Sequence, residues 1–297
     1  MGEFRSDACK FAPMNVQEMT NSMAAALAHR YDQAEARAIA SALLMHHFKG
    51  SPGTWATSQR VLIDEQTEHQ IVQQVERVLQ GEPLQYVLQT AWFCNLQFSV
   101  GPGVLIPRPE TEELVEWIIS ECHSLAQPLQ LLDIGTGSGC IAIALKKRLP
   151  TSEVWALDKS EEAIQYARTN AKQLEASLAL LHMDLFEEKE WTHLPAMDIV
   201  VSNPPYIASH EAALLAEHVR EHEPALALFA PATDPLHYYK KILQLFIAKR
   251  KEKGQLFCEI NPLFANELVS LFEQSGLCAA IKKDMQGKDR MIRGWID

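Results

Sequence analysis

The sequence predicts an α/β protein in which a doubly wound, parallel sheet follows a small helical domain and a β-hairpin. From Leu129 onward, short apolar runs alternate with helical stretches, and the runs are LQLLDIG, SEVWALD, LALLHMD, MDIVVSN and GQLFCEI. Such alternation is typical of βαβ units, whose parallel sheet is covered by helices on both faces. From Met14 to about Gln80, in contrast, apolar residues recur at intervals of three and four, which predicts amphipathic helices.

Four segments are expected along the chain. Residues 1–13 lack periodicity and are expected to be a disordered leader or an addition to the natural chain. Residues 14–82 form the predicted helical domain. Residues 83–107 are a predicted β-hairpin linker, because PLQYVLQTAWFCNLQFSV is rich in aromatic and β-branched residues around Asn95. Residues 108–297 are the predicted α/β domain, whose last runs, CAAIKKD and DRMIRGWI, should pair at an edge of the sheet.

Composition argues against several classes of protein. Hydrophobic residues make up 47% of the 297 residues, enough to fill the core of one large domain or of a large and a small one. No apolar run approaches the ~20 residues that span a bilayer, and there is no apolar signal core, so we expect a cytoplasmic protein without a membrane partner. The net charge of −11 repels nucleic-acid backbones, and no direct nucleic-acid partner is expected. The six cysteines are scattered without a C-x-x-C pair, so no metal site is expected.

A glycine-rich loop in LLDIGTGSGCIAIAL predicts a nucleotide-like cofactor. Its glycines follow a strand and open a helix, so the backbone can turn tightly and approach a ligand closely. The dinucleotide fingerprint would place Gly or Ala where this chain has Cys140. A carboxylate at Asp133 would repel a pyrophosphate but suits the cationic amino group of a methionine moiety, which favours S-adenosylmethionine over NAD. The predicted cofactor contacts in this segment are Asp133, Gly135, Thr136, Gly137, Ser138 and Gly139.

Two further acids end predicted strands. Asp158 lies 25 residues after Asp133, where an acid can accept hydrogen bonds from both ribose hydroxyls. Asp184 is placed to bind the adenine amino group, with Leu185 and Phe186 available to pack on the ring. A lone acid at the end of a strand is equally consistent with a helix cap, and the prediction depends on the set of acids.

The stretch VVSNPPYI ends the fourth predicted strand with Asn203, Pro204, Pro205 and Tyr206. Two consecutive prolines fix the backbone, so the Asn203 side chain and the Pro204 carbonyl are held as rigid hydrogen-bond acceptors. Tyr206 supplies a flat aromatic face. This arrangement fits a planar –NH2 group, with two acceptors for its two N–H bonds and one ring stacked on its plane.

The predicted reaction is an in-line transfer of a methyl group to that nitrogen. Acceptors that grip both hydrogens favour a pyramidal nitrogen that can attack a sulfonium methyl, so they act mainly in the transition state. Neither a metal nor a strong base is needed, because the nitrogen's proton becomes acidic once it carries the methyl group. Taken without the glycine loop, the same four residues would be read as a turn after a strand.

The chain from about Met14 resembles the release factor glutamine methyltransferases, the PrmC/HemK family, and its second half resembles class I S-adenosylmethionine-dependent methyltransferases. The motif NPPY alone is shared with adenine-N6 DNA methyltransferases and with methylases of ribosomal RNA and protein, but its combination with IPRPETE is specific to this family. The stretches that carry the resemblance are GEPLQYVLQTAWF, VLIPRPETEELVE, DIGTGSG, SNPPYI, HEPALALFA and GKDRMI.

This resemblance implies N5-methylation of the glutamine in the Gly-Gly-Gln motif of class I peptide chain release factors, with S-adenosyl-L-homocysteine as the product. It implies a seven-stranded methyltransferase domain over residues 108–297 and a substrate-recognition domain over residues 14–82. We also expect a monomer. The implied cofactor contacts fall on the loop Gly135–Gly139 and on Asp158, Leu185 and Asn203. The implied catalytic and substrate-binding residues are Asn203, Pro204, Pro205 and Tyr206, with Arg108, Pro109 and Glu110 near the active site.

Some features leave alternatives open. Glu110 is also consistent with an acid that stabilises a helix N-terminus. The family usually has Gly where this chain has Asn261, and often has an aromatic residue where it has Leu185. An adenine-N6 DNA methyltransferase would use the same cradle on a flipped base, although it should carry a basic recognition region. Another protein, such as a ribosomal protein, is a second possible methyl acceptor, and a cofactor-binding interaction module without activity is a third alternative.

Overall fold

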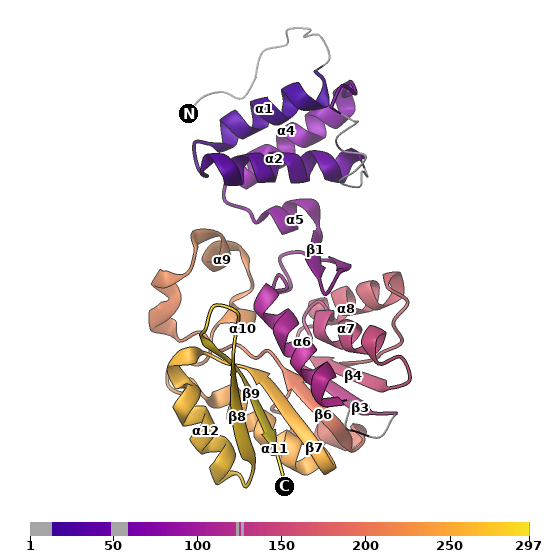
Figure 1. Ribbon diagram of the computed structural model, residues 1–297, viewed down its shortest axis with the longest axis vertical. Coiled ribbons are helices and arrows are strands. Elements are labelled where there is room, and N and C mark those ends of the chain that lie inside the picture. The colour runs from indigo at the N-terminus through magenta and orange to yellow at the C-terminus, as the bar shows by residue number, and fades with distance from the viewer. Residues whose placement is uncertain (1–13, 49–58, 123–124, 126–127, 297) are drawn as a thin grey trace. The chain divides into compact units, whose positions relative to one another are not determined.

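The structure is a computed structural model that describes residues 14–48, 59–122, 125 and 128–296. It divides into two compact units, Met1–Leu88 and Gln89–Asp297 (Figure 1). The predicted leader, residues 1–13, lies outside the described residues. Within the described part of the chain, every helix is too short or too polar to traverse a lipid bilayer.

The first unit is helical, as the periodicity of its apolar residues predicts. Asn15 caps the first helix by accepting a hydrogen bond from the Glu18 backbone N–H at 3.0 Å, and Asp64 caps a later helix in the same way. The apolar faces meet in one core that includes Met19, Leu43 and Val75. Its helices are α1 (Val16–Leu27), α2 (Gln33–Phe48), α4 (Glu65–Leu79) and α5 (Leu84–Leu88).

The predicted hairpin is present but shorter than expected. Its strands are β1 (Thr90–Phe93) and β2 (Leu96–Ser99), and Cys94 and Asn95 form the turn with φ values of 49° and 60°. Residues Leu84–Leu88, expected as strand, form the helix α5 instead. The reason is local, because the Pro83 carbonyl accepts the backbone N–H groups of Tyr86 and Val87 and both side chains are buried.

The second unit contains a sheet of seven strands in the order β5-β4-β3-β6-β7-β9-β8. The first five in this order are parallel, and β9 and β8 are antiparallel at one edge, as the last two apolar runs predicted. The predicted α/β class and the seven-stranded sheet are therefore confirmed. The strands are β3 (Gln130–Ile134), β4 (Glu153–Asp158), β5 (Ala179–His182), β6 (Met197–Ser202), β7 (Arg250–Glu259), β8 (Cys278–Lys283) and β9 (Asp289–Trp295).

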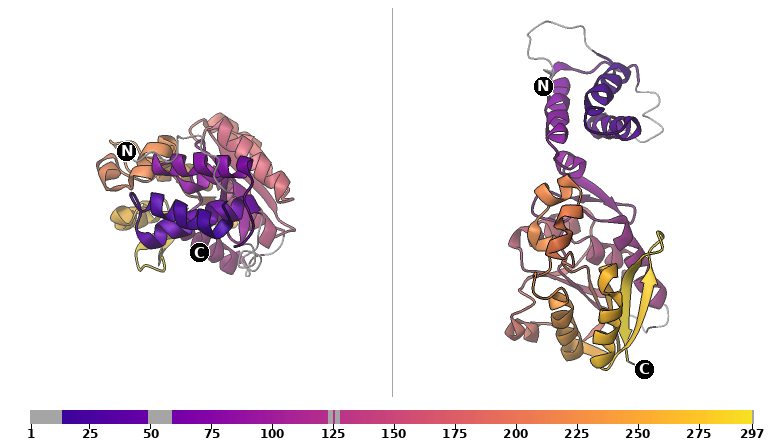
Figure 2. Two further views of the ribbon diagram at one scale, coloured as in Figure 1. Left: turned by 90° about the horizontal axis from the view of Figure 1, so that it is seen from above. Right: turned by 90° about the vertical axis from the view of Figure 1, so that its left-hand side faces the viewer.

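Helices cover both faces of this sheet (Figure 1 and Figure 2). Alternate residues of β7 show the two layers: Leu256 belongs to the core under α11 and α12, whereas Phe257 packs edge-on against Trp117 of α6. The longer helices are α6 (Pro109–Cys122), α7 (Cys140–Arg148), α8 (Glu161–Gln173), α11 (His237–Lys249) and α12 (Ala265–Gln274). The short ones are η1 (Glu188–His193), η2 (Ser209–Leu214), α9 (Glu217–His222), α10 (Ala225–Leu228) and η3 (Pro262–Phe264).

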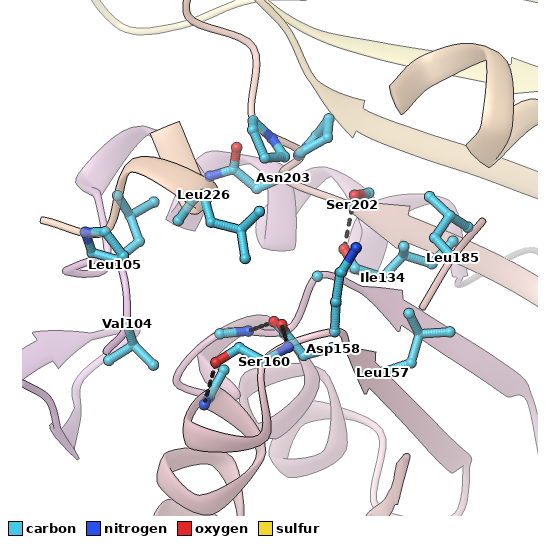
Figure 3. A pocket seen from close by; sticks show the side chains of 18 of the residues that line it. Val104, Leu105, Ile134, Leu157, Asp158, Ser160, Leu185, Ser202, Asn203 and Leu226 are labelled. Carbon is cyan, nitrogen blue, oxygen red and sulfur yellow. Dashed lines mark hydrogen bonds between the residues drawn. The ribbon is translucent and has the colours of Figure 1, made fainter. Parts of the chain in front are cut away.

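The strand order determines where a ligand can bind. The chain leaves β3 for β4 on one side, and β6 later pairs with β3 on its other side. In open α/β sheets, ligands bind outside the carboxyl ends of the strands at such a switch point. Ser202 fixes these ends in register, because its hydroxyl donates to the Ile134 carbonyl at 2.8 Å (Figure 3).

Candidate active site

A cavity of about 310 Å³ opens at the carboxyl ends of β3, β4 and β6 (Figure 3). Its walls come from the glycine loop, from the ends of these strands and from the segment 102–105. Most of the predicted site residues meet there, although they are far apart in the sequence. The predicted residues that line this cavity are Gly135, Gly137, Asp158, Asp184, Leu185, Asn203, Pro204 and Pro205.

The glycine loop forms the floor of the cavity with its backbone. Gly135 and Gly137 have φ values of 72° and 55°, which L side chains rarely adopt, and a Cβ added to either would meet no atom within 4 Å. Gly139 has a different role, because a Cβ there would lie 3.1 Å from the Ala167 side chain of α8. The first two glycines therefore leave room for a ligand, and the third lets the loop pack closely on α8.

Asp133, Thr136 and Ser138 lie beneath this loop and do not line the cavity. Asp133 is 1% exposed, and its Oδ2 accepts the Thr136 hydroxyl at 2.7 Å and the Ala142 backbone N–H at 3.2 Å. Ser138 is likewise buried, and its carbonyl accepts the Asn170 side-chain amide. The structure thus differs from the prediction that the Asp133 carboxylate contacts the cofactor, because the Asp133 and Thr136 side chains turn into the layer under α7. Together with the Ser138 carbonyl they hold the loop in place.

Burial also changes the charge of Asp133. It raises the pKa of this carboxyl to about 7, more than the hydrogen bonds from Thr136 and Ala142 lower it. A carboxyl whose pKa is higher in the folded than in the unfolded chain reduces stability as the pH rises between the two values. In the cofactor-free protein, the free energy of unfolding relative to Asp133→Asn should therefore fall by up to ~4 kcal/mol between pH ~4 and ~7.

Chemical denaturation of both proteins across this pH range measures the difference. The comparison with Asp133→Asn removes contributions of other titrating groups, because they are common to the two chains. A difference that stays constant with pH would show that Asp133 titrates as an ordinary carboxyl.

Asp158 lies on the cavity wall at the end of β4. Its Oδ2 accepts the Gly137 backbone N–H at 2.9 Å, and its Oδ1 accepts the Ser160 backbone N–H at 2.9 Å (Figure 3). Burial raises the pKa of this carboxyl, although the hydrogen bonds from Ser160 and Gly137 lower it. Each oxygen can accept a further hydrogen bond. Asp158 therefore fixes the shape of the glycine loop and still offers acceptors to a ligand in the cavity.

The residues predicted to bind adenine, Asp184, Leu185 and Phe186, lie together on the cavity wall. Asp184 forms an ion pair with Lys159 at 2.7 Å, and this pairing lowers the pKa of Asp184 although burial raises it. Leu185 is buried and lines the cavity. Phe186 also lines it, but its ring stacks on His237 with centroids 4.6 Å apart. Stacking with His237 holds the Phe186 ring in place at the cavity wall.

A second cavity of about 250 Å³ shares a wall with the first. Asn203 and Pro204 line both cavities, whereas Pro205 lines only the first and Tyr206 only the second. The rest of the second cavity is mainly apolar and includes Leu215, Val219 and Leu228. The Asn-Pro-Pro-Tyr motif therefore lies between the two cavities.

The amide of Asn203 has a fixed orientation. Its Nδ2 donates to the Thr111 hydroxyl at 3.2 Å, which leaves Oδ1 with its lone pairs available. Tyr206 is held by its own hydroxyl, which donates to Glu259 at 2.7 Å. Burial and the neighbouring Glu259 carboxylate raise the pKa of Tyr206 well above its ordinary value, so the phenol stays neutral.

Arg108 lines the second cavity and forms an ion pair of 2.6 Å with Glu223, whose other oxygen accepts the Ile106 backbone N–H. Pro109 is the first residue of α6, where its missing N–H costs nothing. Glu110 lines neither of the two cavities and lies in the first turn of this helix, which matches the alternative interpretation of it as a helix N-terminal acid. Among the described residues, no group of three His, Cys, Asp or Glu side chains could hold a metal ion.

Three polar residues of the site were missed by reasoning from the sequence: Thr111, Glu223 and Glu259. Glu259 gave a weak signal, since a carboxylate that ends an apolar strand needs partners. Asn261, the departure from the family pattern, donates to the Tyr206 carbonyl at 3.2 Å and to Glu211 at 2.8 Å. It therefore anchors the chain just after the Asn-Pro-Pro-Tyr turn.

Each of the two units matches a known protein-family model. Residues 18–88 match the PrmC N-terminal domain, and residues 115–228 match the methyltransferase small domain. The chain has 16% identity and a TM-score of 0.50 to a 16S rRNA N2 G1207 methyltransferase of T. thermophilus, solved with AdoMet and guanosine. That likeness covers 70% of this chain and 50% of that one and shows the fold alone.

Curated relatives are closer to this chain than that structure. A release factor glutamine methyltransferase of Flavobacterium psychrophilum is 42% identical over 215 residues, which are 71% of this chain and 75% of the relative. The enzyme of the same name from Bacteroides thetaiotaomicron is 42% identical over 217 residues, or 73% of this chain and 77% of the relative. The two cavities joined at Asn203 and this similarity over both units lead to one conclusion: the chain belongs to the family of release factor glutamine methyltransferases.

Proposed function

We infer that this chain transfers a methyl group from S-adenosylmethionine to the side-chain amide nitrogen, N5, of the glutamine in the Gly-Gly-Gln motif of class I peptide chain release factors. The observation that carries this inference is the shared wall of Asn203 and Pro204 between the two cavities. A donor on one side and an amide on the other would meet at this wall. The names of the relatives supply the identity of the acceptor protein.

The first cavity fits the cofactor in shape and in chemistry. Gly135 and Gly137 leave open space along its floor, and Asp158 offers carboxylate oxygens for the two ribose hydroxyls. Leu185 and Phe186 supply apolar surface for the adenine ring. When bound, S-adenosylmethionine supplies a methyl group on a positively charged sulfur.

The acceptors at the wall determine which nitrogen can react. The Asn203 Oδ1 and the Pro204 carbonyl accept the two N–H groups of the substrate amide, and the Tyr206 ring packs on its plane. These contacts orient the nitrogen and draw it toward the pyramidal geometry of attack, where such acceptors contribute most. The proton that leaves the methylated nitrogen is acidic and can pass to water, so none of the site residues has to act as a strong base.

The second cavity provides the route for the glutamine side chain. Its apolar walls suit the methylenes of glutamine, and the ion pair of Arg108 with Glu223 keeps the entrance next to Asn203 in one shape. Glu223 is buried, so its carboxylate has Arg108 as its partner in place of water. The proposed acceptor is therefore a protein loop that presents a side chain. We further propose that the enzyme is a monomer and acts in the cytoplasm.

The direct test is a mass spectrum of the Gly-Gly-Gln peptide after incubation of the protein with S-adenosylmethionine and a class I release factor. We expect one added methyl group on the glutamine, and none on a release factor whose motif carries alanine at that position. Duplex DNA and a ribosomal protein serve as competing acceptors in parallel reactions. Methyl transfer to either of them but not to the release factor would overturn the proposal.

A further inference from the structure

A chain of hydrogen bonds lies behind the Asn-Pro-Pro-Tyr turn, and its inner members, Thr111 and Glu259, line neither cavity. The Asn203 Nδ2 donates to the Thr111 hydroxyl at 3.2 Å, and the Thr111 hydroxyl donates to Glu259 Oε2 at 2.6 Å. The Tyr206 hydroxyl donates to the other oxygen of Glu259 at 2.7 Å. One carboxylate thus holds two side chains of the turn, one directly and one through Thr111.

Thr111 and Glu259 come from separate elements and are inaccessible. Thr111 lies in the first turn of α6 and is 2% exposed, and Glu259 is the last residue of β7 and is 1% exposed. Neither residue lines the two cavities described above. They cannot touch a cofactor or a substrate there, so any effect on the reaction must pass through Asn203 and Tyr206.

The directions of these hydrogen bonds follow from the charge on Glu259. An ionised carboxylate has no proton and can only accept, so both hydroxyl groups must donate to it. The single proton of Thr111 is then used, and its oxygen can only accept from Asn203. The amide of Asn203 must therefore turn its NH2 group toward Thr111 and keep its carbonyl oxygen free.

The opposite orientation of Asn203 would be unproductive. With Oδ1 turned to Thr111, the amide would present its own NH2 group to the NH2 group of the substrate glutamine. Two donors would then face each other, and a substrate N–H group would lose its acceptor in a desolvated site. The orientation of this amide therefore decides whether Asn203 can accept a hydrogen bond from the substrate.

We propose that Thr111 and Glu259 are positioning residues for methyl transfer, which fix the Asn203 amide with its oxygen available to the substrate. The proposal rests on the proposed function, because it concerns the same acceptor site. The Glu259 carboxylate determines which group donates in each of these hydrogen bonds. The Thr111 hydroxyl passes this constraint on to the Asn203 amide. The tyrosine ring of the turn is held by the same carboxylate.

The surroundings of Glu259 make its charge sensitive to pH. Burial raises the pKa of this carboxyl, and Glu110 of α6 adds to that rise, whereas the hydroxyls of Thr111 and Tyr206 and the cation Arg290 of β9 lower it. Arg290 is itself paired with Asp284 at 3.0 Å, and the Tyr239 hydroxyl of α11 donates to the Glu259 main-chain carbonyl. The net direction is upward, so protonation of Glu259 begins at a higher pH than for an exposed glutamate.

Thr111→Val tests the relay with little change in side-chain volume. It removes the acceptor for Asn203 and one donor to Glu259. We expect kcat for methylation of the release factor to fall about tenfold, as for loss of ~1.4 kcal/mol, while the Kd for S-adenosylmethionine stays within twofold. Thr111→Ser keeps the hydroxyl and should restore kcat to within about threefold of the wild type. Thr192→Val, which removes an exposed hydroxyl of η1 that donates to the Lys189 carbonyl and lines neither cavity, controls for the substitution itself and should leave kcat unchanged.

A second measurement does not depend on that variant being stable. The wild-type kcat should fall as the pH is lowered through the range where Glu259 is protonated, because a protonated carboxyl can donate to Thr111. Glu259→Gln, whose side chain has an NH2 group at every pH, should have a low kcat without this acid limb. A retained acid limb in Glu259→Gln would contradict the role of the carboxylate.

The outcomes separate the two proposals. An active wild type together with a folded Thr111→Val whose kcat is within twofold of it would overturn the relay and leave the proposed function intact. A Thr111→Ser variant as slow as Thr111→Val would also overturn the relay. A wild type that leaves the Gly-Gly-Gln glutamine unmodified would overturn the proposed function, and the relay with it.

Discussion

Asn203→Ala should lower the rate of methyl transfer by ~10²–10³-fold while leaving the affinity for S-adenosylmethionine within a few-fold of the wild type. The alanine removes an acceptor that is fixed before the substrate arrives, and such preorganised polar groups act mostly on the transition state. The substitution does not touch the glycine loop or Asp158, which are the proposed main contacts of the cofactor. Single-turnover methylation of a release factor gives the rate, and calorimetric titration gives the cofactor affinity.

Asn266→Ala is a matched control, because this exposed asparagine lies on α12, away from both cavities. It should change neither the rate nor the cofactor affinity. A loss of cofactor binding in Asn203→Ala with normal turnover at saturation would mean that Asn203 serves the cofactor and does not act on the substrate amide.

Asp158→Ala should have the reverse effect and weaken cofactor binding by about 10²-fold or more. Hydrogen bonds to a carboxylate contribute ~1.5–3 kcal/mol each, and two ribose hydroxyls would lose their acceptor. The Gly137 and Ser160 backbone N–H groups would also lose theirs, so the loop would be less well fixed. Turnover at saturating cofactor should change much less, and calorimetric titration together with saturation kinetics measures both quantities.

The surface residue Asp289 offers a control, since its carboxylate is half-buried in an ion pair with Lys283 at the edge of the sheet. Asp289→Ala should leave cofactor affinity unchanged, because exposed pairs contribute little. If Asp158→Ala bound the cofactor as tightly as Asp289→Ala, the ribose assignment would be wrong.

The parts of the site that follow from the sequence are those set by strand ends and by local backbone. Parallel strands deliver their last residues to one edge of the sheet, so Asp158 and Asn203 were expected to meet there, and both line the first cavity. A tight turn of the backbone was expected at the glycine loop, and Gly135 and Gly137 form it with positive φ values that glycine adopts without strain.

The remaining features depend on contacts that no local pattern reveals. Thr111 and Glu259 are hydrogen-bonded although 148 residues separate them, and Arg108 and Glu223 are paired across 115 residues. The direction of a side chain at a strand's end is also hidden. Asp133 is the last residue but one of β3 and Asp158 is the last of β4, yet Asp133 turns into the helix layer and is buried. The segment Leu84–Leu88 has strand-like composition, but Pro83 starts a helical turn there.

The wall between the cavities has a consequence for which side chains react. Pro204 and Pro205 have restricted backbones and Asn203 is bonded to Thr111, so the acceptors cannot advance to meet a shorter substrate. An asparagine side chain is one carbon–carbon bond, about 1.5 Å, shorter than glutamine. We therefore expect an asparagine in place of the substrate glutamine to stop short of these acceptors and to remain unmethylated, although the two side chains carry the same amide group.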